Sequence, residues 1–545
     1  MVTKQENIGR REMERTYETI SPFEFKNKLI NLAQQHQQKS TQVMLNAGRG
    51  NPNWIAATPR AAFFALGQFA VQESRRVWSD NDLAGKPKRE GMADRFRAYV
   101  EDRADVSGVK LLGDVVDYGI HQHGFAPDDW VHELVDGIVG DNYPVPDRML
   151  DYIEQVVHDY IVQELCSKDA SLGTFDLFAV EGATAAMCYI FDSLLENYLL
   201  AQGDRIAIMV PVFPPYVEIP HLGRYDFDVV EIRAAAVDAK GDHTWQYPDE
   251  EINKLKDPSV KALFLVNPSN PPSVAMKPES VRQLVNVVQE HNPNLIIISD
   301  DVYSTFVDNF RSLMADLPNN TIGVYSFSKY FGVTGWRLGV IAVNRHNVLD
   351  ELLAQLPKNK VDLLNRRYAS LSQHPKELRF IDRVVADSRQ VALNHTAGLS
   401  TPQQVQMALL AGFALLDKGN HYRQLTKDIC HRRMDLLYHG LGLPSPNLPY
   451  DADYYTTFDL DLWATHHYGR EFTDYLQENY EPVDILFRLA EVSSIVLLNG
   501  GGFHGPAWSI RVSLANLEDQ AYSTIGEQLH KALEGYVQEW ESSRR

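Results

Sequence analysis

Cysteine is scarce in this sequence, with three among 545 residues. Cys166, Cys188 and Cys430 lie far apart and form no CxxC pair, which argues against a disulfide scaffold and against a thiolate metal site. We therefore expect no metal centre. A reducing compartment fits so few cysteines best, and we expect the protein to be cytoplasmic.

Long apolar runs and a basic surplus are also missing. No run approaches the roughly 20 apolar residues that a membrane-spanning helix needs, and the start, residues 1–17, is polar and charged rather than an apolar secretion signal. The 52 basic residues against 72 acidic ones give a net charge of −20, which repels polyanions. We expect neither a membrane nor a nucleic acid as partner.

Short apolar runs alternate with amphipathic stretches from about residue 175 to residue 342. This pattern is typical of βαβ units around a parallel sheet. The sequence therefore predicts an α/β fold with a mostly parallel seven-stranded sheet, followed by a smaller α+β domain. The strands are expected at 177–180, 205–210, 228–232, 262–266, 295–299, 323–327 and 338–343, and in the smaller domain at 455–460, 494–498 and 509–514.

The segment Ser326–Lys329 carries the most informative motif. Its lysine follows a predicted strand, stands beside two serine hydroxyls and is followed eight residues later by Arg337. Such a lysine can form an imine with an aldehyde while its neighbours hold a phosphate. An isolated motif of this kind is as often a surface lysine near a turn.

An acidic residue follows the predicted strand 295–299, which precedes the strand next to Lys329. Asp300 follows an isoleucine-rich run, at the edge of the sheet where α/β proteins bind ligands. Its carboxylate can pair with a protonated ring nitrogen and so keep a pyridine ring cationic and electron-withdrawing. Taken alone, Asp300 is more often a cap after the strand.

Three further segments follow predicted strands. The proline-rich loop 267–272 can present Asn270 to a ring hydroxyl, with Tyr303 as a second donor. The small residues of 181–184 suit a phosphate at a helix N-terminus. Phe213 can stack on an aromatic cofactor. Each segment also has a common structural role, as a turn, a βα junction or a core residue.

Arg511 lies inside a strand-like run, 509–513. A buried guanidinium is costly without a partner, and its planar fork suits a carboxylate. The alternative is an outward-facing arginine on an edge strand.

These motifs, in this order, resemble fold type I of the pyridoxal-phosphate enzymes, the aspartate aminotransferase superfamily. The resemblance covers nearly the whole chain and implies pyridoxal 5′-phosphate as cofactor, with Lys329 as the Schiff-base lysine. It implies Asp300 on the ring nitrogen, Asn270 and Tyr303 on the phenolic oxygen, Phe213 on the ring face and Arg511 on the substrate α-carboxylate. It assigns the phosphate to Gly182, Ala183, Thr184, Ser326, Ser328 and Arg337.

Two more segments match the family. Tyr143–Pro146 resembles its YxxP segment, whose tyrosine reaches the phosphate of the partner subunit, and Gly50–Trp54 resembles its amino-terminal lid. The resemblance thus implies at least a homodimer. It also divides the chain into an N-terminal arm with part of the small domain (1–54), a large cofactor-binding domain (55–415) with an insertion near 80–140, and a C-terminal small domain (416–545).

Departures from the common pattern narrow the expected activity. The chain is longer than ordinary aminotransferases, and 394–403 lacks the arginine that grips a distal carboxylate in dicarboxylate aminotransferases. With Arg49 and Gly50 in the lid as expected substrate contacts, the chain most resembles the bacterial L-aspartate β-decarboxylases. A tight ion pair on the distal carboxylate would stabilise a charge that vanishes as carbon dioxide leaves, and so would raise the barrier.

The resemblance therefore implies conversion of L-aspartate to L-alanine and carbon dioxide, with side aminotransferase activity, in an assembly larger than a dimer such as a dodecamer. The main alternative is an aminotransferase for aspartate or another amino acid. A second alternative is a non-catalytic binding or regulatory protein with this fold. A metal hydrolase is disfavoured, because the histidine pairs 121/123 and 466/467 lack HExxH spacing.

Overall fold

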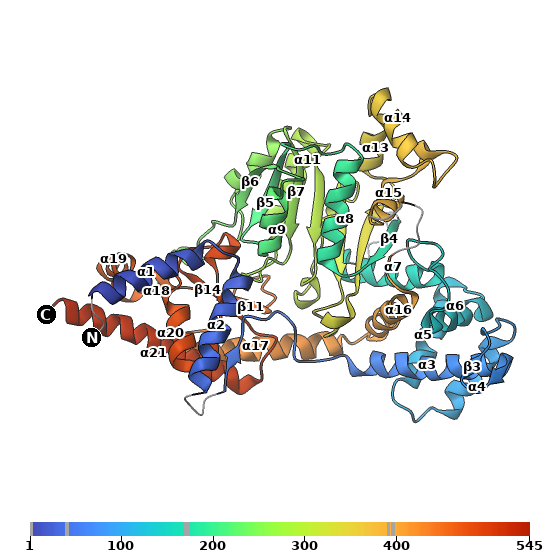
Figure 1. Cartoon of the computed structure of the whole chain (residues 1–545), viewed down its shortest axis with the longest axis horizontal. Coiled ribbons are helices and arrows are strands. Elements are labelled where there is room, and N and C mark those ends of the chain that lie inside the picture. Colours follow the sequence, from blue (N-terminus) through green and yellow to red (C-terminus); the bar gives the residue numbers. More distant parts are fainter. Residues whose placement is uncertain (1–3, 39–42, 168–173, 390–392, 394–397) are drawn as a thin grey trace.

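The computed structural model describes residues 4–38, 43–167, 174–389, 393 and 398–545. A central sheet flanked by helices forms one part of the molecule, and a helix-rich part beside it contains both chain ends (Figure 1). The helices are α1 Lys4–Glu18, α2 Pro22–Gln37, α3 Ala57–Val77, α4 Met92–Asp102, α5 Val109–His123, α6 Pro127–Val139, α7 Asp151–Leu165, α8 Ala183–Glu196, α9 Pro214–Glu218, α10 Asp249–Ile252, α11 Pro278–His291, α12 Leu313–Asp316, α13 Val348–Ala354, α14 Lys358–Arg367, α15 Phe380–Asp387, α16 Thr401–Leu416, α17 His421–Leu441, α18 Leu460–Tyr468, α19 Arg470–Asn479, α20 Asp484–Ser493 and α21 Asp519–Ser543.

The strands are β1 Leu45–Asn46, β2 Ser79–Asp80, β3 Leu83–Ala84, β4 Phe175–Val180, β5 Arg205–Val210, β6 Asp228–Arg233, β7 Val260–Val266, β8 Ile296–Asp300, β9 Thr321–Ser326, β10 Gly339–Asn344, β11 Tyr455–Asp459, β12 Ile495–Val496, β13 Leu498–Asn499 and β14 Ser509–Ser513. Short 3-10 helices lie at Ile219–His221, Asn253–Lys256, Ser304–Phe306, Thr334–Trp336, Pro375–Glu377 and Gly501–Phe503.

The central sheet has seven strands in the order β4-β10-β9-β8-β7-β5-β6. β10 runs antiparallel to both of its neighbours, and the other pairs are parallel. All seven strands predicted from the alternating pattern are present, within a few residues of the expected bounds. Short apolar runs, such as Ile296–Ile298, identified them because strands of a parallel sheet are buried on both faces.

Helices cover both faces of this sheet. One face packs on α11 through Leu284 and Val287, which share a core cluster with Leu263 and Ile297 of β7 and β8. The other face belongs to a larger cluster that includes α7, α8 and α16. The sheet is therefore a rigid central layer, and its carboxyl edge is left for a site.

The second part of the molecule has its own core, built from both ends of the chain. Phe25 and Leu29 of α2 pack with Phe487 of α20 and Leu529 of α21. β11, β14 and β13 form an antiparallel sheet, and β1 pairs with β12. The expected small domain of residues 1–54 and 416–545 remains a prediction.

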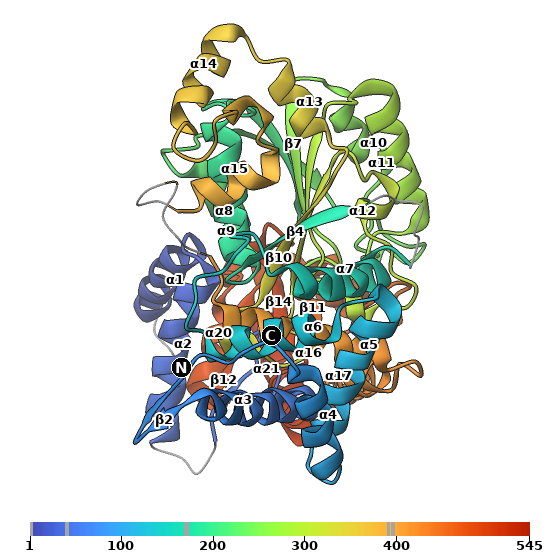
Figure 2. The same cartoon turned by 90° about the vertical axis from the view of Figure 1, so that its right-hand side faces the viewer.

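Residues 80–140 are more regular than their sequence indicates. They form α4, α5 and α6, which gather with α3 and α16 at one end of the molecule (Figure 2). Glycines with positive φ (Gly91, Gly108, Gly124, Gly140) separate these short helices. Because glycine interrupts the chain every few turns, no apolar period is sustained long enough to reveal them.

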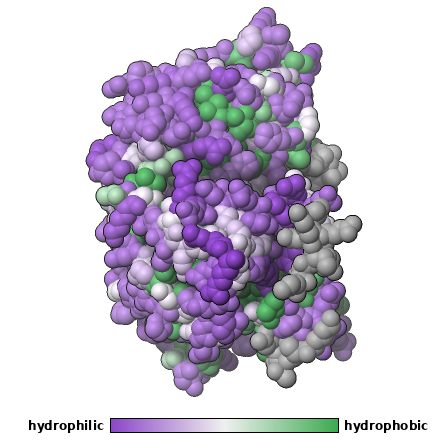
Figure 3. Space-filling model, turned by 90° about the vertical axis from the view of Figure 1, so that its left-hand side faces the viewer, coloured by the Kyte–Doolittle hydropathy of each residue, from purple (hydrophilic) through white to green (hydrophobic). Residues whose placement is uncertain are grey.

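None of the helices in the described ranges combines the length and the apolar composition needed to cross a bilayer. Figure 3 shows that the face carrying both chain ends is mainly hydrophilic.

Candidate active site

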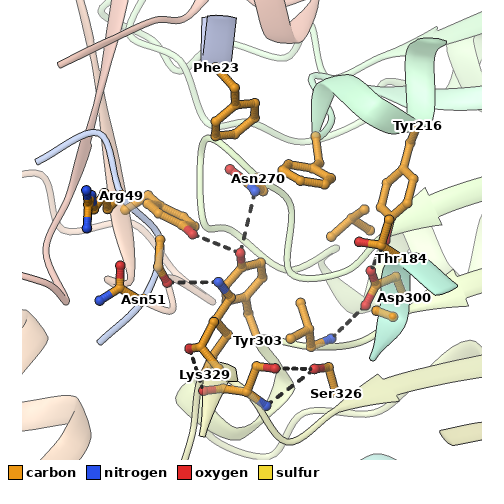
Figure 4. Close-up of a pocket in the computed structure, with 18 of the residues that line it drawn as sticks. Phe23, Arg49, Asn51, Thr184, Tyr216, Asn270, Asp300, Tyr303, Ser326 and Lys329 are labelled. Atoms are coloured by element: carbon orange, nitrogen blue, oxygen red, sulfur yellow. Dashed lines mark hydrogen bonds between the residues drawn. The ribbon is translucent and has the colours of Figure 1, made fainter. Parts of the chain in front are cut away.

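A cavity of about 450 Å³ lies at the carboxyl edge of the central sheet. Its other sides are closed by residues 48–51, where the lid begins, by helix α2 and by strands β11 and β14. Both parts of the molecule therefore contribute to it (Figure 4). Nearly all of the predicted site residues line it: Arg49, Gly50, Ala183, Thr184, Phe213, Asn270, Asp300, Tyr303, Ser326, Ser328, Lys329, Arg337 and Arg511. Segments separated by more than 400 residues therefore meet at one cavity.

Lys329 follows β9 and points into the cavity (Figure 4). Its Nζ atom donates a hydrogen bond of 2.8 Å to the carbonyl oxygen of Gly50. A β carbon on Gly50 would lie 3.1 Å from this Nζ and 2.5 Å from the hydroxyl of Tyr455. The lid backbone thus packs directly on the lysine amine, and a residue with a side chain at position 50 would crowd it.

One corner of the cavity gathers groups that suit a phosphate. Ser326 and Ser328 lie 3.0 Å apart through their hydroxyls, near the N-terminus of α8. Gly182 precedes that helix with φ of 89°, and a β carbon there would lie 2.4 Å from Nη2 of Arg337. Glycine thus lets the guanidinium lie close to the helix start, where backbone N–H groups also attract anions.

Asp300 is the last residue of β8 and is 3% exposed. The hydroxyl of Tyr216 donates to its Oδ2 at 2.7 Å, and the backbone N–H of Val302 donates to Oδ1 at 3.2 Å. Burial raises the pKa of Asp300 to about 6, while these two hydrogen bonds and the charge of Lys329 oppose the rise. The carboxyl group is therefore ionised at neutral pH and can accept a hydrogen bond from a cationic ring nitrogen.

Three neutral polar groups line the middle of the cavity. The Asn270 amide donates to the hydroxyl of Tyr303 at 3.5 Å, and that hydroxyl lies 3.0 Å from the hydroxyl of Tyr455. Burial, together with Tyr455, raises the pKa of Tyr303 well above its usual value. The Tyr303 phenol therefore stays protonated and can donate to an anionic oxygen.

Arg511 is 1% exposed, so the structure supports the inward orientation. Its Nη2 donates to the carbonyl oxygen of Gly48 at 2.8 Å and its Nη1 to Oδ1 of Asn270 at 3.3 Å. Its Cζ atom lies 4.3 Å from the ring centre of Tyr455. Its Nε is buried without a hydrogen-bond partner, and no carboxylate of the described residues forms an ion pair with it. Burial lowers the pKa of Arg511. A carboxylate ligand would neutralise this buried cation.

Among the lining residues that sequence reasoning missed, four bring an aromatic or a cationic side chain. Phe23 and Lys26 come from α2, and burial with the nearby charges of Arg49 and Arg511 lowers the pKa of Lys26. No local pattern links α2 to the sheet, so only the fold could reveal it. Tyr216 lies three residues after Phe213, and Tyr455 is the first residue of β11. Nothing in the sequence distinguishes either residue from a tyrosine of the core.

Phe213 lies in the aromatic wall of the cavity. Its ring meets those of Phe23 and Tyr216 edge-on, at 5.4 Å in both cases. The expected stacking of Phe213 on a cofactor ring remains a prediction.

Tyr143 does not line the cavity of its own chain. Its side chain is 75% exposed, and Val145 beside it is 77% exposed. The expected contact with a partner's phosphate remains a prediction. Residues 394–397 of the segment without an arginine lie outside the described residues.

Comparison with known proteins agrees with this geometry. A family model described as aminotransferase class I and II matches residues 184–526. The chain belongs to the class I and II aminotransferase family. A Pseudomonas protein named bifunctional aspartate aminotransferase and L-aspartate beta-decarboxylase is 48% identical over 97% of this chain and 98% of that protein.

Solved structures of this family share the fold at low identity. The aspartate aminotransferase of Rhizobium meliloti has a TM-score of 0.58 and 16% identity, and covers 94% of this chain and 96% of its own. The Thermus thermophilus enzyme with maleate has a TM-score of 0.55 and 16% identity, over 93% and 96%. The predicted fold and superfamily are confirmed.

Pyridoxal 5′-phosphate is the cofactor of this family, and the cavity of this family member fits it. Four kinds of group line it: an amine that can bond an aldehyde, an ionised carboxylate, a phenol, and a cationic corner that suits a phosphate. The uncompensated Nε of Arg511 marks a place for a further anion. The expected cofactor is confirmed by the family, while the individual residue roles remain predictions.

Proposed function

We propose that this chain is a pyridoxal-phosphate-dependent L-aspartate β-decarboxylase that releases L-alanine and carbon dioxide and has a minor aminotransferase activity. One structural observation carries the proposal: a buried guanidinium without a counter-ion, Arg511, shares a cavity with the amine of Lys329. An α-amino acid offers the matching pair of groups, a carboxylate and an amine. The near-full-length similarity to the Pseudomonas bifunctional protein favours aspartate as that amino acid.

In this proposal each side of the cavity holds one part of the cofactor. Lys329 would hold its aldehyde carbon, Asp300 its ring nitrogen, and Asn270 with Tyr303 its phenolic oxygen. Phe213 would contact the ring. Bound pyridoxal phosphate supplies an electron sink for bonds broken at the substrate's α and β carbons. The phosphate is assigned to Gly182, Ala183, Thr184, Ser326, Ser328 and Arg337, with Tyr143 reaching it from a partner subunit.

The two carboxylates of L-aspartate meet different environments. The fully buried Arg511 grips the α-carboxylate through its planar fork, which fixes the substrate. The β-carboxylate faces Lys26, which is half-buried, and Arg49, which is exposed. Solvent weakens an ion pair with an exposed cation. The negative charge of the β-carboxylate, which disappears when carbon dioxide leaves, is therefore only weakly stabilised in the bound substrate.

Lys329 moves the proton at the α carbon, taking it from the substrate and returning it to the product. Its amine is held by the Gly50 carbonyl, on the lid side of the cavity. Asp300 stays ionised because Tyr216 donates to it. The aromatic side chains of Phe23 and Phe213 keep water from one wall during these steps.

The second candidate is an aminotransferase, which the family itself supports. Both activities use Lys329, Asp300 and Arg511. Incubation with L-aspartate alone distinguishes them. A decarboxylase gives sustained, equimolar carbon dioxide and alanine, whereas an aminotransferase stops after one turnover without an added oxo acid. A protein that binds pyridoxal phosphate but turns over no amino acid would instead be a binding or regulatory member of the fold.

The proposal includes an assembly of at least two chains, which extends to a larger homo-oligomer such as a dodecamer. The exposed Tyr143 and Val145 support a chain contact at this loop. Light scattering of the wild type and of Tyr143→Ser measures the assembly. A monomeric wild type with full activity would contradict the shared site. The cytoplasmic location stays a prediction.

A further inference from the structure

The carbonyl oxygen of Gly50 accepts two hydrogen bonds. Nζ of Lys329 donates to it at 2.8 Å, and the hydroxyl of Tyr454 donates to it at 2.9 Å. The donors come from different parts of the fold, because Lys329 follows β9 and Tyr454 precedes β11. Both lone pairs of this oxygen are therefore engaged.

Tyr454 is a rigid donor. Its side chain is 0% exposed, and its ring lies 5.1, 5.0 and 5.0 Å from the rings of Tyr303, Tyr455 and Phe306. Its backbone N–H is fixed by the hydroxyl of Ser273 at 3.1 Å. The phenolic oxygen consequently has little freedom to move relative to the cavity.

The lid backbone depends on few contacts at this point. Gly50 has no side chain, and the side chains of Arg49 and Asn51 are exposed. Arg511 donates to the carbonyl two residues earlier, that of Gly48, at 2.8 Å. The position of the Gly50 carbonyl over the lysine amine therefore depends largely on the hydrogen bond from Tyr454.

We propose that Tyr454 is a positioning residue, which holds the Gly50 carbonyl where it accepts a hydrogen bond from the Lys329 amine whenever that amine is not bonded to the cofactor. The inference rests on the proposed function, because it concerns the amine that moves the proton at the α carbon. A misplacement of about 1 Å in a reacting group can cost about 100-fold in rate. Loss of one supporting hydrogen bond should cost about 10-fold.

The test compares Tyr454→Phe with Tyr99→Phe. Tyr99 is a matched control, because it is 5% exposed and donates one hydrogen bond of 2.9 Å to a carbonyl, that of Ala65, away from the cavity. Rates are measured per bound cofactor, so that loss of folded protein does not count. We expect Tyr454→Phe to lower kcat about 10-fold with KM changed less than about 2-fold, and to raise the isotope effect of α-deuterated aspartate. Tyr99→Phe should change neither.

A second readout uses the cofactor-free protein. Pyridoxal phosphate is added, samples are reduced with borohydride at intervals, and the label on Lys329 is followed by peptide mapping. We expect Tyr454→Phe to slow labelling several-fold relative to Tyr99→Phe. Equal labelling rates together with an equal kcat in the two variants would overturn the inference, as would a rise in KM at unchanged kcat.

Failure of the proposed function is distinguishable from failure of this inference. Exchange of the α hydrogen of aspartate with deuterium oxide needs no loss of carbon dioxide. If the wild type exchanges this hydrogen but forms no alanine, the decarboxylase proposal fails. Slower exchange in Tyr454→Phe alone would then still support the role of Tyr454, and unchanged exchange would contradict it.

Discussion

Two buried arginines in the same part of the molecule differ in their partners. Arg433 and Arg511 are 3% and 1% exposed, and both lie over a tyrosine ring. Arg433 pairs with the carboxylate of Asp519 at 2.9 Å and donates to the carbonyl oxygen of Leu514 at 3.0 Å. Among the residues that the structure describes, Arg511 donates only to neutral oxygens. The protein therefore neutralises one cation internally and leaves the other without a carboxylate from this part of the chain.

The two neighbouring aspartates at the end of β8 show the same contrast. Asp301 faces the core and accepts hydrogen bonds from the hydroxyls of Ser299 and Ser312, at 2.8 and 2.5 Å. Asp300 lines the cavity, with Tyr216 as its one side-chain donor. The charged groups that face the cavity thus keep part of their hydrogen-bonding or ion-pairing capacity free. The comparison predicts that their replacement affects activity more than stability.

The largest expected effect is on Arg511. Replacement by Met removes the proposed anchor of the α-carboxylate, and we expect kcat/KM for aspartate to fall about 1,000-fold, the loss of a buried charge pair. The free energy of unfolding should stay equal or rise, because a buried, unneutralised charge is removed. Steady-state kinetics and urea titration measure the two quantities.

Arg433→Met is the matched control for this variant. It leaves the buried carbonyl of Leu514 without a donor, so we expect unfolding to become easier by about 1–3 kcal/mol. Nη2 of Arg433 also donates to Oδ1 of Asn53 at 2.9 Å, in the segment that follows Gly50, so the folded fraction should lose some kcat/KM but far less than Arg511→Met loses. If both variants lost activity and stability alike, the contrast between the two arginines would be wrong.

The next effect is on Asp300→Asn, which should lower kcat about 100-fold because the ring nitrogen loses its anionic partner. Stability should move the other way. The folded pKa of about 6 exceeds the unfolded value of about 3.9, so the ionised form costs stability that grows from about pH 4 to 6 and stays near 3 kcal/mol above it. The cofactor-free variant should therefore be more stable than the wild type at pH 8 and equal to it at pH 4.

Urea midpoints of both proteins at the two pH values check this sign. An equal midpoint at pH 8 would show that Asp300 carries no burial cost in the folded protein.

The smallest effect is on Tyr216→Phe. The hydrogen bond from Tyr216 lowers the pKa of Asp300, so its loss should raise that pKa further. We expect the acid limb of cofactor binding to shift to higher pH, and kcat at pH 8 to fall only about 3-fold to 10-fold, as one hydrogen bond to a charged group is lost. Absorbance titrations of cofactor binding against pH measure the shift. An unchanged acid limb would mean that Tyr216 does not tune Asp300.

The central strands and the residues that follow them were predictable from the sequence, because buried runs such as Ile296–Ile298 end in polar side chains at a fixed edge of the sheet. The contribution of α2 was not, since Phe23 meets Phe213 only after both chain ends pack together. The short helices of 80–140 were hidden by glycines for a local reason. Contacts between distant segments need the fold, and contacts at strand ends do not.

Reduction of the protein with borohydride in the presence of pyridoxal phosphate, followed by peptide mapping, tests the central claim most directly. The account predicts one pyridoxyl group per chain, on Lys329. In Lys329→Ala both this label and the turnover of L-aspartate should be lost. A label on another lysine, or turnover that survives this replacement, would contradict the account.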